Sequence, residues 1–134
     1  MTTAVPVQGL AHIGIRVHDL ERSMRFYALL GFTKTLGPLG PEPVAILHHP
    51  AGIEINLILN APKASEPNVL MDVPEKHAGY THVALLCPDL LAAKALLAEQ
   101  GIAVREGPVR FGPGAQGMFV RDPDGNVVEL HQRG

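Results

Sequence analysis

The chain repeats itself, and this repeat constrains its fold more than any other feature of the sequence. The segment LAHIGIRVHDLERSMRFYALLGF, which starts at Leu10, aligns with YTHVALLCPDLLAAKALLAEQGI, which starts at Tyr80, at an offset of 70 residues. The alignment pairs His12 with His82, Asp19 with Asp89, Leu20 with Leu90, Ala28 with Ala98 and Gly31 with Gly101. Self-similarity at a fixed offset indicates two copies of one supersecondary unit.

Each copy predicts a strand followed by a helix. Asp19 and Asp89 are predicted helix N-caps, because an Asp carboxylate accepts the free N–H groups of the first helical turn. Gly31 and Gly101 stand where a helix ends in a left-handed residue. Apolar residues recur at helical spacing between each Asp and its Gly, so one helix is predicted in each copy.

Strand-like segments complete each copy. The predicted strands are 10–17, 33–36, 43–48 and 53–60 in the first copy, and 80–87, 103–106, 117–121 and 126–132 in the second. Two Pro- and Gly-containing turns, at 49–52 and 122–125, separate the last two strands of each copy. The sequence therefore predicts an α+β fold of two βαβββ modules in one domain over residues 1–134. Module one covers about 8–60, and module two covers 80–132. The Pro-rich segment 61–79 is a linker, or a loop that closes over a site.

The faces of the predicted strands place one His and one Glu of each module together. Strand side chains alternate between faces. Glu54 alternates with the apolar residues of its strand and Glu129 with those of the last strand, so both point away from the helix. The strand at 80–87 is apolar on both faces, which predicts that it is buried.

Four side chains at equivalent positions predict a divalent metal site made by His12, Glu54, His82 and Glu129. A single His or Glu in a strand is usually structural, but the repeat makes a coincidence of two such pairs improbable. A carboxylate buried without a partner among apolar residues is costly, and a cation removes that cost. Two carboxylates also neutralise the charge of a divalent ion.

Composition and charge argue against several other classes. The formal net charge is −2 and no basic run exists, so the sequence predicts no nucleic-acid or anionic-membrane partner. It contains no apolar stretch of the length that a membrane helix needs. No secretion signal is visible at the N-terminus, and the only cysteine is Cys87. These features predict a cytoplasmic protein.

The motifs HIGIRVHDLERSMRFYALLGF, GIEINLIL, GYTHVAL and FVRDPDGNVVEL resemble the vicinal oxygen chelate superfamily, which includes glyoxalases, bleomycin-resistance proteins and extradiol dioxygenases. The resemblance covers residues 10–132. It implies that the sheets of the two modules form an open, barrel-like cleft with a metal ion inside. It also implies a homodimer with metal sites at the interface, since small members often build each site from two subunits.

Within the superfamily, the ligand pattern resembles glyoxalase I. Extradiol dioxygenases use two His and one Glu around Fe(II), and the additional Glu54 argues against that chemistry. The resemblance implies isomerisation of a small oxygenated substrate, such as the hemithioacetal of a 2-oxoaldehyde and a thiol. The metal polarises the substrate oxygens, and Glu129, with Glu54 opposite it, moves a proton between adjacent carbons. Nickel or zinc is the expected ion, with Co, Mn and Fe as alternatives.

The substrate-binding residues are less constrained. Arg16 matches a glutathione-contacting Arg of glyoxalase I, and Arg110 lies where the family often has a Lys near the carboxylate of the thiol. Ile58 replaces a common Asn, although Asn56 shares its face. Three alternatives stay open: a resistance-type protein that sequesters a small molecule, an epimerase, and a dioxygenase. Fold alone does not decide among them.

Overall fold

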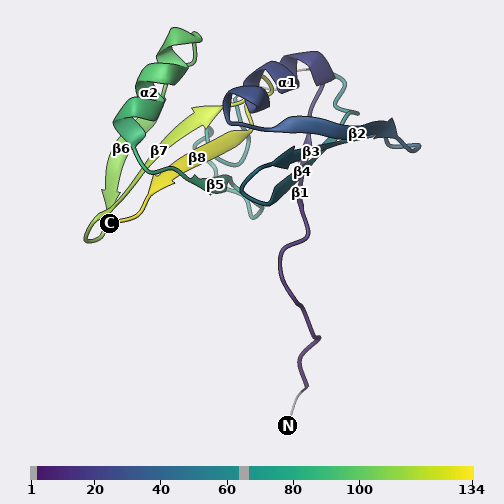
Figure 1. The fold of residues 1–134 in the computed structure, drawn as a ribbon, viewed down its shortest axis with the longest axis horizontal. Coiled ribbons are helices and arrows are strands. Elements are labelled where there is room, and N and C mark those ends of the chain that lie inside the picture. Colours follow the sequence, from purple (N-terminus) through teal and green to yellow (C-terminus); the bar gives the residue numbers. More distant parts are fainter. Residues whose placement is uncertain (1–2, 64–66) are drawn as a thin grey trace.

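The computed structural model describes residues 3–63 and 67–134, and it contains the same series of elements twice (Figure 1). Module one consists of β1 (Ile13–Arg16), α1 (Leu20–Leu29), β2 (Thr33–Leu39), β3 (Val44–His49) and β4 (Ile53–Ile58). Module two consists of β5 (Val83–Leu86), α2 (Leu90–Glu99), β6 (Glu106–Phe111), β7 (Ala115–Arg121) and β8 (Val127–Gln132). The predicted α+β class with two βαβββ modules is confirmed. No helix in the described part of the chain is long and apolar enough to cross a membrane.

Each module forms its own four-stranded sheet, in the orders β1-β4-β3-β2 and β5-β8-β7-β6. The first and last strands of each module are parallel, and all other neighbours are antiparallel. The helix that follows β1 or β5 provides the crossover that a parallel pair requires. One face of each sheet packs into the core with the helices, and we call the opposite face, which carries Glu54 or Glu129, the open face.

The helix boundaries follow the predicted caps. The Asp19 carboxylate accepts a hydrogen bond from the backbone N–H of Arg22 at 2.9 Å, and the Asp89 carboxylate accepts one from the backbone N–H of Ala92 at 3.1 Å. Gly31 lies just after α1 with a φ of 95°, a backbone conformation that favours glycine. These local signals depend only on neighbouring residues, which explains why the sequence alone located both helices.

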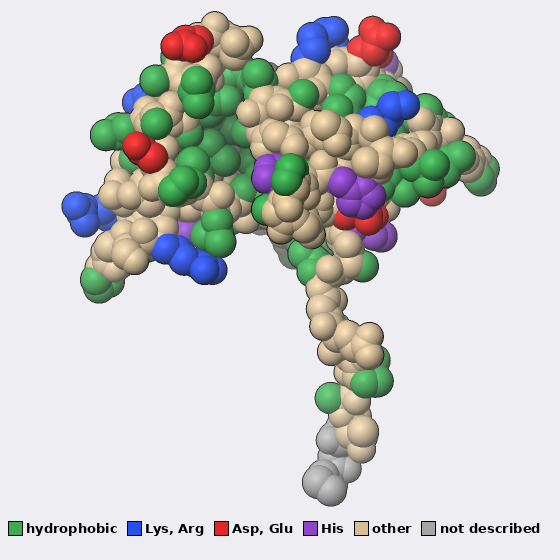
Figure 2. Space-filling view, viewed as in Figure 1, with side chains coloured by type: hydrophobic (Ala, Val, Ile, Leu, Met, Phe, Trp, Pro, Cys, Tyr) green, Lys and Arg blue, Asp and Glu red, His purple; other side chains and the backbone are tan. Residues whose placement is uncertain are grey.

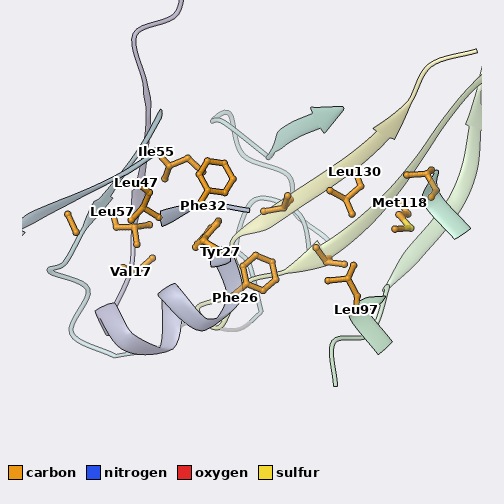
Figure 3. Packing of buried hydrophobic residues seen from close by; sticks show 14 residues of the cluster. Val17, Phe26, Tyr27, Phe32, Leu47, Ile55, Leu57, Leu97, Met118 and Leu130 are labelled. Atoms are coloured by element: carbon orange, nitrogen blue, oxygen red, sulfur yellow. The ribbon is translucent and has the colours of Figure 1, made fainter. Parts of the chain in front are cut away.

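One hydrophobic core spans both modules (Figure 3). Module one contributes Ile55 and Leu57 from β4, and module two contributes Leu130 from β8. Phe26 and Tyr27 of α1 lie between these two groups in Figure 3. Their rings meet edge to face, with the ring centroids 5.0 Å apart. The aromatic face of α1 therefore holds the two modules together.

A buried polar network reinforces this junction between the modules. The Tyr27 hydroxyl donates to the Asp122 carboxylate at 2.8 Å, and Arg22 donates to the carbonyl of Pro123 at 2.7 Å. Asp122 also accepts from the backbone N–H groups of Asp124 and Asn126, each at 2.9 Å. Burial raises the pKa of the Asp122 carboxyl and, together with that carboxylate, raises the pKa of Tyr27. The β7–β8 turn of module two is thus anchored on α1 of module one.

The segment between the modules docks on module two. Asp72 pairs with Arg121 at 2.7 Å, and the Asn68 amide donates to the carbonyl of Gly125 at 3.1 Å. The hydrogen bonds from Arg121 lower the pKa of the Asp72 carboxyl. The predicted linker 61–79 therefore makes specific contacts, although its residues 64–66 lie outside the described part of the chain. Closure of this segment over a ligand stays a prediction.

Several strands differ from the sequence-based expectations in their bounds or in their burial. β1 begins at Ile13 rather than Leu10, because its register with β4 starts there. Residues 3–9 extend away from the body (Figure 1 and Figure 2). β6 occupies 106–111 instead of 103–106, because its pairing with β7 runs from Glu106 to Phe111. The burial predicted for 80–87 is wrong. β5 is an edge strand, and its Leu86 is 62% exposed on the open face.

Candidate metal centre

In module one, two histidines flank the Glu54 carboxylate on the open face. His12, directly before β1, places its Nδ1 at 3.7 Å from Glu54 Oε2. His48, opposite Glu54 in the β3–β4 register, places its Nε2 at 3.1 Å from Oε1. The Thr35 hydroxyl lies 2.6 Å from the other ring nitrogen of His48. The Glu54 side chain is 29% exposed, so this group is open to solvent.

Module two repeats the arrangement in a more buried setting. His82 Nε2 lies 3.0 Å from Glu129 Oε1, and His131 Nδ1 lies 2.6 Å from Glu129 Oε2. The Thr81 hydroxyl lies 2.9 Å from His82 Nδ1 and so holds the ring by its second nitrogen. The Glu129 side chain is only 7% exposed. The two modules thus present equivalent His–Glu pairs, one accessible and one buried.

A glycine creates the space for the Glu129 carboxylate. Gly117 on β7 pairs with His131, and a Cβ at position 117 would lie 2.7 Å from Glu129 Oε2 and 2.5 Å from the Phe111 ring. No side chain fits there without displacing one of the two. The position of the Glu129 carboxylate therefore depends on the absence of a side chain at Gly117.

Replacing Gly117 by Ala is expected to destabilise the fold by about 1–3 kcal/mol, the usual cost of overpacking. Gly14, on the open face of module one, provides the matched control, because a Cβ there meets only Ile58 at an ordinary 3.6 Å. We expect Gly14→Ala to change stability by less than about 1 kcal/mol. Urea unfolding of both variants measures the difference, and equal stabilities would contradict this account of Gly117.

His48 and His131 were not among the residues predicted from the sequence. His131 follows Glu129 by two positions, so strand alternation puts both on one face. His48 faces Glu54 across the hairpin, which becomes apparent only when the turn at 49–52 fixes the register. The spacing in β8 was a usable signal, whereas the contact of His48 required the pairing of two strands.

The four predicted ligands meet as two pairs. His12 lies with Glu54, and His82 lies with Glu129. Within residues 3–63 and 67–134 of one chain, no three His, Cys, Asp or Glu side chains are arranged to hold a metal ion. Two grooves, of about 650 and 620 Å³, lie between the modules, and none of the four residues lines either of them. A single chain thus presents two separate His–Glu pairs.

The predicted substrate-binding residues fall on different faces. Arg16 shares the open face with Glu54 and donates from Nε to Asn60 Oδ1 at 2.7 Å. Asn56 lies two residues beyond Glu54, and its Oδ1 is buried without a hydrogen-bond partner among the described residues.

Arg110 occupies the helix face of its sheet. It pairs with Gln116, which in turn pairs with Gln132. The Gln132 side chain accepts a hydrogen bond from the N-terminus of α2, at Leu90, at 3.0 Å. Directly opposite residues in antiparallel strands point to the same face. Arg110 is therefore not brought to the Glu129 carboxylate within one chain.

The pairs meet chemical requirements for a divalent ion. Imidazole nitrogens and carboxylate oxygens are ligands that Zn²⁺ and similar ions accept. A ligating His usually has its second nitrogen held by a neighbouring group, as Thr81 holds His82. Glu129 is a nearly buried carboxylate among apolar strands, a position that a cation stabilises. The donor set of these residues therefore fits a metal ion.

The fold and its paired His–Glu groups define a two-module protein of the glyoxalase type. A profile of the Glyoxalase/Bleomycin resistance protein/Dioxygenase superfamily matches residues 9–130. The chain belongs to this superfamily.

Individual relatives agree with this assignment. A lactoylglutathione lyase from Haemophilus influenzae is 33% identical over 130 residues, which cover 90% of each protein. A glyoxalase/dioxygenase structure from Nostoc punctiforme is 23% identical with a TM-score of 0.75, covering 99% of this chain and 97% of that one. An antibiotic-binding protein from Streptomyces sp. CB03234 is 24% identical with a TM-score of 0.72, covering 98% and 100%. The two structures show the same fold and carry no information on activity at this identity.

Proposed function

We propose that the protein is a metal-dependent lyase or isomerase of glyoxalase I type. Its substrate is a small oxygenated compound such as the hemithioacetal of a 2-oxoaldehyde and a thiol. The observation that carries the proposal is the pair of equivalent His–Glu groups, at 3.7 Å in module one and 3.0 Å in module two. The similarity to a lactoylglutathione lyase supports the same reaction class. A cytoplasmic location is part of the proposal.

The complete site requires two chains in this proposal. His12 and Glu54 of one subunit face His82 and Glu129 of the other, so that a symmetric dimer has two four-ligand sites. Twofold symmetry is the commonest way to close such contacts. The two equivalent His–Glu pairs support this arrangement, because four ligands require both pairs to meet.

The residues have distinct roles in the reaction. A bound divalent ion, with Ni or Zn expected first, supplies Lewis-acid polarisation of the substrate oxygens. Glu129 removes a proton from one carbon and returns it to the adjacent carbon, while Glu54 faces it across the site. The burial of Glu129 keeps water from the transferred proton. Arg16 and Asn56 contact the substrate from the open face of module one.

Metal content tests the proposal first. Elemental analysis of the purified protein should give about one divalent ion per chain, since a dimer with two sites holds two. His82→Ala should lose this ion. His77→Ala should retain it, because His77 lies outside both pairs, with its Nε2 3.9 Å from Glu75 Oε2. Activity on a methylglyoxal hemithioacetal should return when Ni²⁺ or Zn²⁺ is restored to stripped protein. Absence of both metal and activity would favour the alternative of a sequestering protein.

A mixed dimer tests whether each site is shared. A heterodimer of a His12→Ala subunit and a Glu129→Gln subunit should have one intact site and one doubly damaged site. Its activity should be about half that of the parent dimer. The two variant homodimers provide the baseline, since each has a defect in both sites. A heterodimer no more active than these homodimers would show that each chain builds its own site.

A further inference from the structure

The His82–Glu129 pair lies within a group of aromatic rings. His82 meets Phe119 edge to face with ring centroids 5.3 Å apart. Phe119 meets Phe111 in the same way at 6.5 Å, and Phe111 stacks on His131 at 6.2 Å with an interplanar angle of 6°. We call Phe111 and Phe119, with the two histidine rings, the aromatic wall.

The aromatic wall belongs to the open face. Phe119 lies directly opposite Glu129 in the β7–β8 register, and a Cβ at Gly117 would touch both Phe111 and Glu129. Phe111 is 44% exposed. Two of the four phenylalanines of the chain are thus placed beside the candidate site rather than in the core. Exposed aromatic rings that converge with a few polar groups are typical of small-molecule sites.

The arginine next to the aromatic wall already has carboxylate partners. Arg121 is only 5% exposed and pairs with Asp72 at 2.7 Å and with Glu106 at 3.0 Å. Arg110 lies on the opposite face of the sheet. Leu86 and Val109, which share the open face, are apolar and exposed. Within the described part of one chain, the surroundings of Glu129 therefore offer flat apolar surface, and the arginine on this face is already paired.

We propose that the substrate carries an aromatic or other flat apolar group beside its vicinal oxygens, and that Phe111 and Phe119 determine this specificity. This inference rests on the proposed function for the position of the oxygens, which the His–Glu groups bind. The apolar group packs against Phe111 and Phe119, since ring pairs are most stable when stacked with an offset or edge to face.

Mandelate and lactate provide matched probes, because mandelate carries a phenyl group where lactate carries a methyl group and the two are otherwise identical. Isothermal titration calorimetry of the parent protein should give mandelate an affinity at least about tenfold higher than lactate. Phe111→Ala and Phe119→Ala should reduce this ratio to within about threefold, while Phe111→Tyr, which keeps the ring, should retain it. Leu91→Ala is the control, because Leu91 is an exposed apolar residue on α2 outside the wall.

The outcomes separate this inference from the proposed function. Equal affinities in the parent, no detectable binding of mandelate, or a ratio unchanged in both Phe→Ala variants would overturn the inference even if metal and isomerase activity are present. A mandelate preference in metal-free, inactive protein that disappears in Phe111→Ala would support the aromatic specificity. The same result would contradict the proposed metal-dependent lyase function. If Phe111→Ala instead converts a dimer to a monomer and leaves the ratio intact, a second copy covers the wall and the inference is wrong.

Discussion

Replacing Glu129 by Gln is expected to lower kcat by about 10²–10⁴-fold, the range that a general acid–base residue contributes. The amide has the shape of the carboxylate but cannot accept the transferred proton. Folding should change little, because Gln fits the space opposite Gly117, and its carbonyl oxygen can still accept a hydrogen bond from His131. The His131 contact with Glu129 Oε2, at 2.6 Å in the parent, is therefore kept.

The measurement compares kcat per bound metal ion with the free energy of unfolding of the same variant. Normalising to metal matters because Glu129 is also a proposed ligand. Glu75→Gln is the matched control, since Glu75 is exposed and lies in the segment between the modules. If Glu129→Gln binds metal and keeps its full turnover rate, Glu129 is not the base, and Glu54→Gln becomes the variant to examine.

The second large effect is structural. Replacing Asp122 by Ala is expected to destabilise the protein by about 3 kcal/mol or more, because buried donors that lose their acceptor cost about 1–3 kcal/mol each. The affected donors are the Tyr27 hydroxyl, the backbone N–H groups of Asp124 and Asn126, and the Asn126 amide. Tyr27→Phe removes only the hydroxyl and keeps the ring, so it should cost about 1 kcal/mol. Urea unfolding tests both, and equal losses would contradict the network.

Asp122 also predicts how the stability of the protein depends on pH. Burial raises the pKa of Asp122 in the folded state above its unfolded value. The protonated form is therefore favoured by folding, so the contribution to stability is complete below about pH 3.9, the unfolded pKa, and is lost as pH rises through the folded pKa. The stability difference between the parent and Asp122→Ala should accordingly be largest at acid pH and decrease above it. A difference that grows with pH would contradict the buried position of the carboxyl.

Much of the secondary structure follows from local sequence. Asp19 and Asp89 cap the helices because their carboxylates reach N–H groups three residues away, and Gly31 ends α1 because its φ is positive. The alternation in β4 and β8 placed Glu54 and Glu129 on the face away from the helices. The repeat then related His12 to His82. Each of these inferences needs only neighbouring residues or the comparison of two segments within the chain.

Strand pairing decided what the periodicity left undetermined. The position of β6 at 106–111 follows from its register with β7, and that register turns Arg110 away from Glu129 and brings Phe111 to it. The exposure of Leu86 follows from the place of β5 at the edge of its sheet. Local propensity does not predict the position of β6 or the exposure of Leu86, because both depend on which strands lie next to one another in the sheet.

The sequence by itself determined the two modules, their helices and the two His–Glu pairs, since all of these come from short-range spacing that is written twice. Only the tertiary structure decided how the modules meet. Tyr27 and Asp122 are 95 residues apart, and their hydrogen bond exists because α1 of module one packs on the β7–β8 turn of module two. That packing leaves His12 with Glu54 and His82 with Glu129 as separate pairs within one chain. Contacts between distant segments depend on how two hydrophobic surfaces fit together, and no spacing along the chain encodes that fit.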